Sequence, residues 1–250
     1  MKRSLIDRLL QPVKPRPMPS FAPPPRPLAD GLWRLERKLA MPGGLVLPVA
    51  MTIIRLPSGK LFLHSPTPLD ERTEMAIAEL GPVGVLLAPN SFHYVFVAAY
   101  VDRFPGSQLF AAPGLPERVT GFPAATVVGA AAPEAWQGVV EPIVFGPVGS
   151  FSEVVIYHRP TGTLMLTDLA FCMLRYENAF DRIGWRLFGI PPAFGASRSA
   201  RLTLLRNGRA AKPFLEKMLE KDFRRVLVAH GDPLEENARA EFQRAFRRYL

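Results

Sequence analysis

Short apolar runs alternate with helical patterns along residues 60–113, and this alternation favours a layered α/β fold. The run Val83–Ala88 has the length and composition of a buried strand. A helical pattern precedes it, with Thr67 as the expected cap, Pro68 in the first turn and Gly81 at the expected end. After it, HYVFVAAYVDRF predicts a second helix and SQLFAAP predicts a further strand.

The order of strands followed by a helix occurs twice along the chain. Thr52–Leu56 and Lys60–Leu63 predict one hairpin, and SEVVIYHRPTGTLMLTDLAF predicts another, in which we interpret His158 as exposed. An apolar, arginine-rich stretch at residues 170–208 and the amphipathic helix AKPFLEKMLEKDF lead to the strand-like run RVLVAHGD. We therefore expect two β-then-helix halves.

Prolines are densest between Gln11 and Leu28, where they fix φ and remove backbone donors. We predict that residues 1–40 form a proline-rich basic arm, although the pattern becomes strand-like from Trp33. Residues 41–250 are long enough for one domain with a closed core, and we expect residues 170–208 to be an insertion in it.

The composition fits a soluble globular chain, with 48% hydrophobic and 21% charged residues. The net charge of +9 is uneven: residues 1–40 carry +6, residues 41–196 carry −3 and residues 197–250 carry +6. No aromatic residues are interleaved with these charges in a recognisable motif, so we expect no sequence-specific binding of nucleic acid. The single cysteine, Cys172, cannot form an internal disulfide, and we interpret it as buried and unreactive.

The chain is expected to be cytoplasmic. Its start, MKRSLIDRLLQPVKPRPMP, reaches charged residues and prolines before any continuous apolar stretch forms, unlike a secretion signal. No run approaches the roughly 18 to 20 apolar residues of a membrane-spanning helix, so we expect no transmembrane segment.

Three ligand-type side chains follow predicted strands. His93 comes a few residues after one apolar run, Asp168 directly after a second and His230 directly after a third. In layered α/β folds the loops at the carboxyl ends of strands point into a common crevice. Two imidazoles and one carboxylate also form a complete set of ligands for one divalent metal.

The segments LFLHSP, LLAPNSFH, FPGSQLFAAPG, TGTLMLTDLAF and RVLVAHGD, in this order, resemble the metallo-β-lactamase fold. They are most similar to a divergent branch of it, the DUF4336 family, over roughly residues 45–245. The resemblance implies an α/β architecture, a four-layer αββα sandwich. It also matches Asp168 to the family's bridging aspartate and His230 to its terminal histidine.

The parent motif His-x-His-x-Asp-His fits best with its last histidine on His93. The remaining ligand positions of the parent then fall on residues that bind metals poorly or not at all: Ala88, Asn90, Phe92 and a position near Gly149. This alignment removes the first metal site of the parent. It leaves His93, Asp168 and His230 as ligands of a second, mononuclear site.

An alternative register puts Asn90 at the first histidine position. His93 would then face elsewhere, and the centre would hold no metal. Asp168 and His230 would form a hydrogen-bonded pair within a polar network.

Two functions follow from these alternatives. The first is a hydrolase of a small-molecule ester, thioester or phosphoester, with Asp168 and His230 as catalytic residues and one zinc, iron or manganese ion as cofactor. We expect Asn90, Tyr94 and Asp232 to orient the metal-binding side chains through hydrogen bonds.

The second function is a catalytically silent binding or scaffolding protein with a degenerate metal centre and no cofactor. Residues 170–208 would then mediate self-association or bind a protein partner. In both cases we interpret Ser65 as a turn residue at the entry to a helix.

Overall fold

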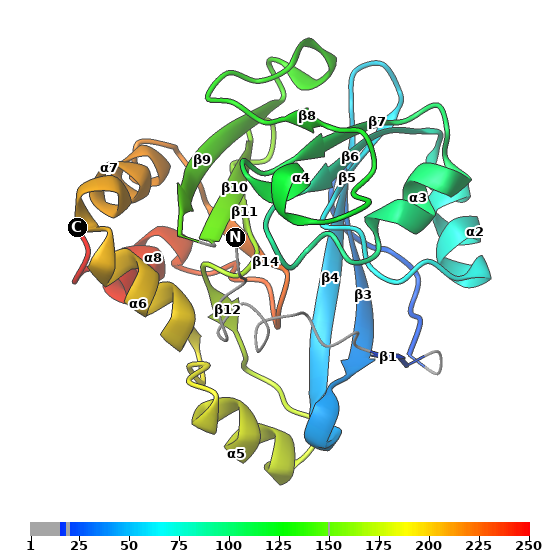
Figure 1. Cartoon of the computed structure of the whole chain (residues 1–250). Helices are drawn as coiled ribbons and strands as arrows, with labels where there is room; N and C mark the ends of the chain where they lie inside the picture. The colour runs from blue at the N-terminus through cyan, green and yellow to red at the C-terminus, as the bar shows by residue number, and fades with distance from the viewer. Residues whose placement is uncertain (1–15, 19–20, 150) are drawn as a thin grey trace.

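The computed structural model describes residues 16–18, 21–149 and 151–250, which are organised around two sheets (Figure 1). The large sheet has the order β1-β3-β4-β5-β6-β7-β8, with β2 paired to β3. The small sheet has the order β14-β11-β10-β9, and β12 and β13 form a separate pair. The strands of the large sheet are β1 (Arg16–Pro17), β2 (Arg26–Ala29), β3 (Leu32–Ala40), β4 (Val46–Arg55), β5 (Leu61–His64), β6 (Val83–Ala88), β7 (Gln108–Ala111) and β8 (Thr126–Val127). The others are β9 (Val140–Val148), β10 (Phe151–His158), β11 (Thr163–Leu166), β12 (Phe171–Cys172), β13 (Phe194–Gly195) and β14 (Arg225–Val228).

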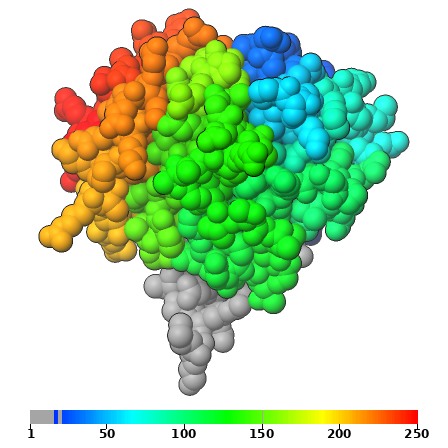
Figure 2. All heavy atoms as spheres, turned by 90° about the horizontal axis from the view of Figure 1, so that it is seen from above, coloured from blue at the N-terminus to red at the C-terminus, as the bar shows by residue number. Residues whose placement is uncertain are grey.

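Helices cover the outer faces of both sheets. The α-helices are α2 (Glu71–Leu80), α3 (Val97–Arg103), α4 (Leu115–Arg118), α5 (Ala179–Leu187), α6 (Arg198–Arg206), α7 (Gly208–Leu219) and α8 (Ala238–Phe246), and the 3-10 helices are η1 (Pro42–Gly44) and η2 (Glu134–Trp136). Ile77 and Tyr100 of α2 and α3 pack on the large sheet, and Phe214 and Phe242 of α7 and α8 pack on the small one. Helices α2 and α3 thus lie on the opposite side of the molecule from α7 and α8 (Figure 2).

A central apolar layer joins the inner faces of the two sheets. Phe62 and Leu87 of the large sheet share one buried cluster with Ile156 and Leu227 of the small sheet. This layer and the two outer helix layers make the four-layer αββα sandwich that we expected.

Parallel pairing brings several strand ends to one edge of the sandwich. In the large sheet, Leu63 pairs with Leu86, so the loops after β5 and β6 start side by side. In the small sheet, Leu166 pairs with Val228, so Asp168 and His230 each follow their strand by two residues. The register therefore places these two side chains at the same edge.

Most of the predicted elements are present, but two helices begin later than expected. The strand Val83–Ala88 is confirmed, as is a hairpin between β4 and β5. Helix α2 begins at Glu71 rather than near Thr67, because Asp70 is the cap and accepts a hydrogen bond from the backbone N–H of Thr73. Helix α3 begins only at Val97.

The second hairpin and the predicted insertion have defined structures. His158 is buried rather than exposed, because β10 lies between β9 and β11, and its Nδ1 lies 2.7 Å from the hydroxyl of Thr161. Within residues 170–208 the chain forms β12, α5, β13 and α6. Figure 1 shows α5 at one end of the molecule, near the tip of the β3–β4 hairpin.

The segment that we expected to be an arm includes part of the large sheet. Strand β3 pairs with β4 along its whole length, and Leu32, Leu35 and Leu39 are buried. The parts of the predicted arm at residues 1–15 and 19–20 lie outside the described residues. Among the described residues, none of the helices has the length and apolar content needed to cross a membrane.

Candidate metal centre

Three side chains from different parts of the chain meet at the edge where the strands end. Nε2 of His93 lies 3.0 Å from Nε2 of His230. Each of these nitrogens lies 3.4 Å from an oxygen of Asp168, Oδ2 for His93 and Oδ1 for His230. The potential ligand atoms of all three residues lie within 4.8 Å of one another. His93 thus faces the centre, as the first alignment requires, although its role as a ligand stays a prediction.

The spacing of these atoms fits a metal ion. Zinc binds imidazole nitrogen and carboxylate oxygen at about 2.0–2.2 Å in tetrahedral geometry, which separates neighbouring ligand atoms by roughly 3.3 Å. The two His–Asp separations of 3.4 Å match this value. The donor set suits zinc, iron or manganese alike.

His230 is held in one orientation by two neighbours. Its Nδ1 lies 2.9 Å from the carbonyl oxygen of Pro48, which can only accept a hydrogen bond. Nδ1 therefore carries the proton, and the lone pair of Nε2 faces the centre. The ring of Phe171 stacks on the imidazole at 4.6 Å between ring centroids.

His93 is held by Ser65, a residue that we had interpreted only as a turn. The hydroxyl of Ser65 lies 2.6 Å from Nδ1 of His93. Ser65 has a φ of 59°, in the left-handed region that non-glycine residues rarely adopt. The available signal was that Ser65 directly follows β5, at the same edge as the other site residues.

Asn90 connects the loop of His93 to Asp168. Its side-chain amide donates hydrogen bonds to Oδ2 of Asp168 at 2.6 Å and to the hydroxyl of Thr167 at 2.8 Å. Its carbonyl oxygen accepts from the backbone N–H groups of Phe92 and His93, both at 2.8 Å. All the hydrogen-bonding groups of this buried amide are therefore engaged.

Glu153 is a buried carboxyl group that the sequence reading missed. Its two oxygens accept hydrogen bonds from the backbone N–H groups of Thr167 and Leu169, on either side of Asp168. Burial and the nearby charge of Asp168 raise the pKa of Glu153 to about 7. The signal was an acidic residue inside the apolar strand FSEVVIYH.

The electrostatics of the centre favour an ionised Asp168 beside a neutral His93. Although burial alone would raise the pKa of Asp168, the neighbouring His93 and His230 hold it well below its ordinary value. Burial lowers the pKa of His93, and this effect outweighs the opposite effect of Asp168. A cation binds to imidazole nitrogens that carry a lone pair and to an ionised carboxylate.

A cavity of about 480 Å³ opens onto the three side chains. Phe92 lines this cavity with 45% of its surface exposed, so it does not fill the space beside His93. Of the residues that our alignment puts at the parent's other ligand positions, Ala88 and Asn90 are buried and Gly149 is exposed.

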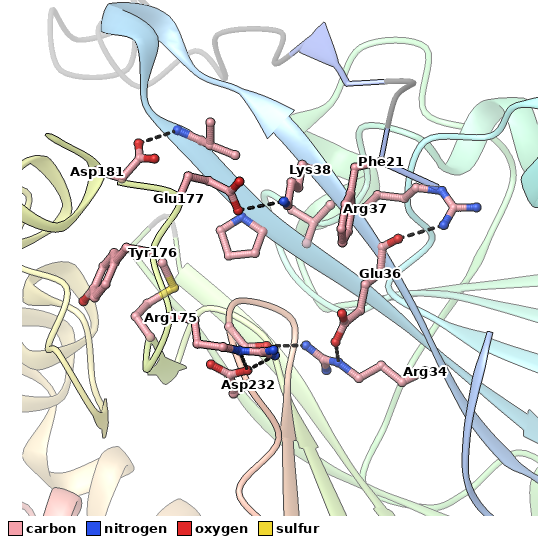
Figure 3. A pocket seen from close by; sticks show the side chains of 15 residues that line it. Phe21, Arg34, Glu36, Arg37, Lys38, Arg175, Tyr176, Glu177, Asp181 and Asp232 are labelled. Carbon is pink, nitrogen blue, oxygen red and sulfur yellow. Dashed lines mark hydrogen bonds and ion pairs between the residues drawn. The ribbon is translucent and has the colours of Figure 1, made fainter. Parts of the chain in front are cut away.

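The other predicted supporting residues lie further out. Tyr94 packs edge-on against Phe122 at 6.0 Å between ring centroids. Asp232 pairs with Arg175 in a second pocket, of about 220 Å³ (Figure 3). Cys172 is buried as expected, and burial raises the pKa of its thiol to about 11.

Arg34 lies in the second pocket and forms hydrogen bonds with the backbone at the turn after β14. Its guanidinium is buried and donates to the carbonyl oxygens of Val228 at 2.7 Å and Gly231 at 2.5 Å. It also pairs with Glu36 at 2.8 Å (Figure 3). These bonds fix the backbone on both sides of His230.

Comparisons with solved structures give the same architecture. The chain is similar to the DIM-1 metallo-β-lactamase exposed to ceftazidime, with 14% identity, a TM-score of 0.59 and coverage of 92% of this chain and 100% of that one. It is similar to a metallo-β-lactamase from Pontibacter korlensis, with 15% identity, a TM-score of 0.58 and coverage of 91% and 99%. A third match is a metallo-β-lactamase from Erythrobacter litoralis with β-mercaptoethanol in the active site, with 15% identity, a TM-score of 0.60 and coverage of 90% and 96%.

Sequence comparison identifies the branch. No curated protein sequence matches the chain. Residues 29–181 match the family model described as "Domain of unknown function (DUF4336)". This match spans more than half of the 250 residues. The chain therefore belongs to the DUF4336 family and has a divergent metallo-β-lactamase fold.

Proposed function

We propose that the protein is a hydrolase that holds one divalent metal ion at His93, Asp168 and His230. The observation that carries the proposal is the convergence of these three donors within 4.8 Å, at the base of an open cavity. Zinc, iron and manganese fit the donor set equally well. Such an ion would polarise the substrate and lower the pKa of a water molecule.

The residues of the chain supply positioning. Pro48 fixes the tautomer of His230, and Ser65 and Asn90 hold His93 and Asp168 in place. Asp168 would supply the negative charge that binds the ion, and the hydrogen bond from Asn90 to its Oδ2 fixes the orientation of the carboxylate. A small-molecule ester, thioester or phosphoester would enter through the cavity.

The test is hydrolysis of chromogenic esters, thioesters and phosphoesters by protein supplied with zinc, iron or manganese. Asp168→Asn and His93→Ala should reduce kcat/KM by at least a hundredfold, because the first replaces the anionic ligand with a neutral amide and the second removes a donor. Asp222→Asn, at an exposed position outside the centre, serves as the matched control. Turnover that persists in both site variants would refute the proposal.

A binding or scaffolding protein without a metal is the second candidate. It is favoured by the contact of 3.0 Å between the two Nε2 atoms, which is short enough for a direct hydrogen bond. Residues 170–208 would then be the working surface, for self-association or a protein partner, because α5 exposes several apolar side chains. Metal-independent folding together with absent turnover would support this candidate.

We also propose the cytoplasm as the location of the protein. The chain has one cysteine, which is buried, so its stability does not depend on an oxidising compartment. Fractionation of the native host with an antibody against the chain tests this, and recovery in a compartment on the far side of the cytoplasmic membrane would overturn it.

A further inference from the structure

The cavity at the proposed metal centre is lined mostly by apolar side chains. Its polar lining residues are those of the centre and its surroundings: Ser65, Thr67, His93, Asp168 and His230. The walls are formed by aliphatic and aromatic side chains, among them Leu47, Val95, Phe96, Trp185, Phe188 and Ile190. Among the described residues, no Lys or Arg lines the cavity.

Helix α5 forms one wall of the cavity and is bonded to the rest of the fold. The backbone N–H of Val46 donates to Oδ1 of Asp181 at 2.9 Å, and the indole N–H of Trp185 donates to the carbonyl oxygen of Val46 at 2.9 Å. Gly184 packs so closely that a Cβ there would lie 2.4 Å from Leu45. Helix α5 is therefore fixed against the start of β4.

This arrangement discriminates between substrate classes. An acyl chain gains binding free energy with each methylene group that it buries against such walls. A phosphate or carboxylate group on the same walls would lose its hydration without meeting a cationic side chain. At about 480 Å³ the cavity also falls within the usual size range of small-molecule sites.

We propose that the cavity binds the apolar acyl chain of an uncharged carboxylic ester or thioester, with the acyl carbonyl at the His93–Asp168–His230 centre. This inference rests on the proposed hydrolase function and narrows its substrate. Water adds its oxygen to the acyl carbon, the bond from that carbon to the alcohol oxygen or thiol sulfur breaks, and the leaving group takes up a proton. Phosphoesters and carboxylate-bearing β-lactams should be poorer substrates than such esters.

The kinetic test compares p-nitrophenyl octanoate, p-nitrophenyl acetate, p-nitrophenyl phosphate and ceftazidime with the metal-loaded protein. The octanoate should have a kcat/KM at least tenfold above that of the acetate, and the kcat/KM of both anionic compounds should lie below that of the octanoate. A preference for the phosphate or for ceftazidime would overturn the substrate class while leaving the hydrolase proposal standing.

A binding test examines the apolar cavity independently of ester hydrolysis. Octan-1-ol should displace a neutral apolar dye from the metal-free protein. Leu47→Lys and Val95→Lys should each weaken dye binding at least tenfold, because each puts a cation on a cavity wall. Leu202→Lys, at an exposed leucine of α6 outside the cavity, is the matched control. No dye binding, or equal binding in all the variants, would overturn the proposal even if esters are hydrolysed.

A second inference comes from the outer face of α5. Phe180, Ile183 and Leu187 are 59%, 57% and 71% exposed, and their spacing places them on one side of the helix. Phe188, which follows the helix and is 65% exposed, also lines the cavity. An apolar face therefore runs from α5 to the mouth of the cavity.

Positive charge predominates around this face, because Asp181 of α5 is buried and bonded to Val46, and Glu177 before the helix pairs with Lys38. Between residues 182 and 215 the sequence contains seven Lys or Arg residues and no Asp or Glu. Arg182 and Arg186 are exposed on α5. Arg198 and Arg201 of α6 donate to the carbonyl oxygens of Leu187 and Gly189, both at 3.1 Å, which places two more cations at the end of α5.

We infer that α5 docks on an anionic lipid surface, with Ile183 and Leu187 entering the acyl boundary and the arginines contacting the headgroups. Exposed apolar residues flanked by cations are the pattern of helices that lie in a membrane interface. The excess of positive charge fits an anionic surface better than a second copy, because two such faces would repel each other.

Co-sedimentation with vesicles tests this docking. The protein should sediment with phosphatidylcholine vesicles that contain phosphatidylserine, and much less with pure phosphatidylcholine or in high salt. Leu187→Glu should abolish sedimentation, whereas Met75→Glu, at a position on α2 that is 58% exposed, should not. Equal binding to both kinds of vesicle, sedimentation that survives Leu187→Glu, or a dimer that Leu187→Glu disrupts would overturn the inference.

Discussion

The hydroxyl of Ser65 lies 2.6 Å from Nδ1 of His93, and this contact joins the end of β5 to the loop after β6. Ser65 makes it from a backbone conformation with a φ of 59°. Left-handed backbone costs a non-glycine residue roughly 1–2 kcal/mol. This strained backbone occurs at the residue that orients the His93 imidazole.

Replacing Ser65 separates its two effects. Ser65→Ala and Ser65→Gly both remove the hydroxyl, so both should lower metal affinity roughly tenfold to a hundredfold in a chelator competition assay. Only glycine relieves the backbone strain. Ser65→Gly should therefore be about 1 kcal/mol more stable than Ser65→Ala in urea denaturation. Unchanged metal affinity in both variants would show that the hydroxyl does not support His93.

Removing the Asn90 amide should destabilise the protein. Asn90→Ala leaves the donors and acceptors of the His93 loop and of Asp168 without their partner, which should lower the free energy of unfolding by roughly 2–4 kcal/mol. Thr167→Val removes only one of these bonds and should have a clearly smaller effect. Equal losses in the two variants, measured by chemical denaturation, would argue against the central role of Asn90.

Gly231 allows the turn that carries His230. Its φ is +97°, and a Cβ there would lie 2.1 Å from the carbonyl oxygen of Cys172. Gly231→Ala should therefore lower stability by at least about 2 kcal/mol. Gly129→Ala is the control, because no atom lies within 4 Å of the added Cβ. A Gly231→Ala variant as stable as the wild type would contradict the close approach of Gly231 to Cys172.

Acidification should destabilise the fold partly through His158. Burial lowers its pKa from 6.5 to about 4 in the folded protein, so between these values the unfolded chain binds more protons. The stabilising contribution is present above pH 6.5 and is lost as the pH falls, by roughly 2 kcal/mol between pH 7 and 5. His158→Asn should show a shallower loss in urea denaturation at the two pH values. Equal losses of unfolding free energy in the wild type and in His158→Asn would contradict the lowered pKa of His158.

Local patterns predicted the strands better than the ends of the helices. Val83–Ala88 is a buried run between turn signals, and the observed strand has the same bounds. Thr67 and Asp70 are both acceptable caps, and nothing local chooses between them. The start of α3 depends on the side chain of Asn90, which holds the backbone of Phe92 and His93 in a turn.

The candidate site was predictable only where each residue follows its own strand. His93, Asp168 and His230 could be proposed because each lies after an apolar run, and parallel strand ends share an edge. The contacts of Ser65, Glu153 and Pro48 with the centre depend on pairing between distant segments. Sequence periodicity carries no information about those pairings, and it likewise left the burial of His158 unpredicted.

The most direct test of the metal centre is elemental analysis of protein purified without chelators. The wild-type protein and a His158→Asn control should contain about one zinc, iron or manganese ion per chain, because both keep the three donors. His230→Ala should lose most of this metal. A content well below one ion per chain in the wild type that does not fall further in His230→Ala would contradict the account.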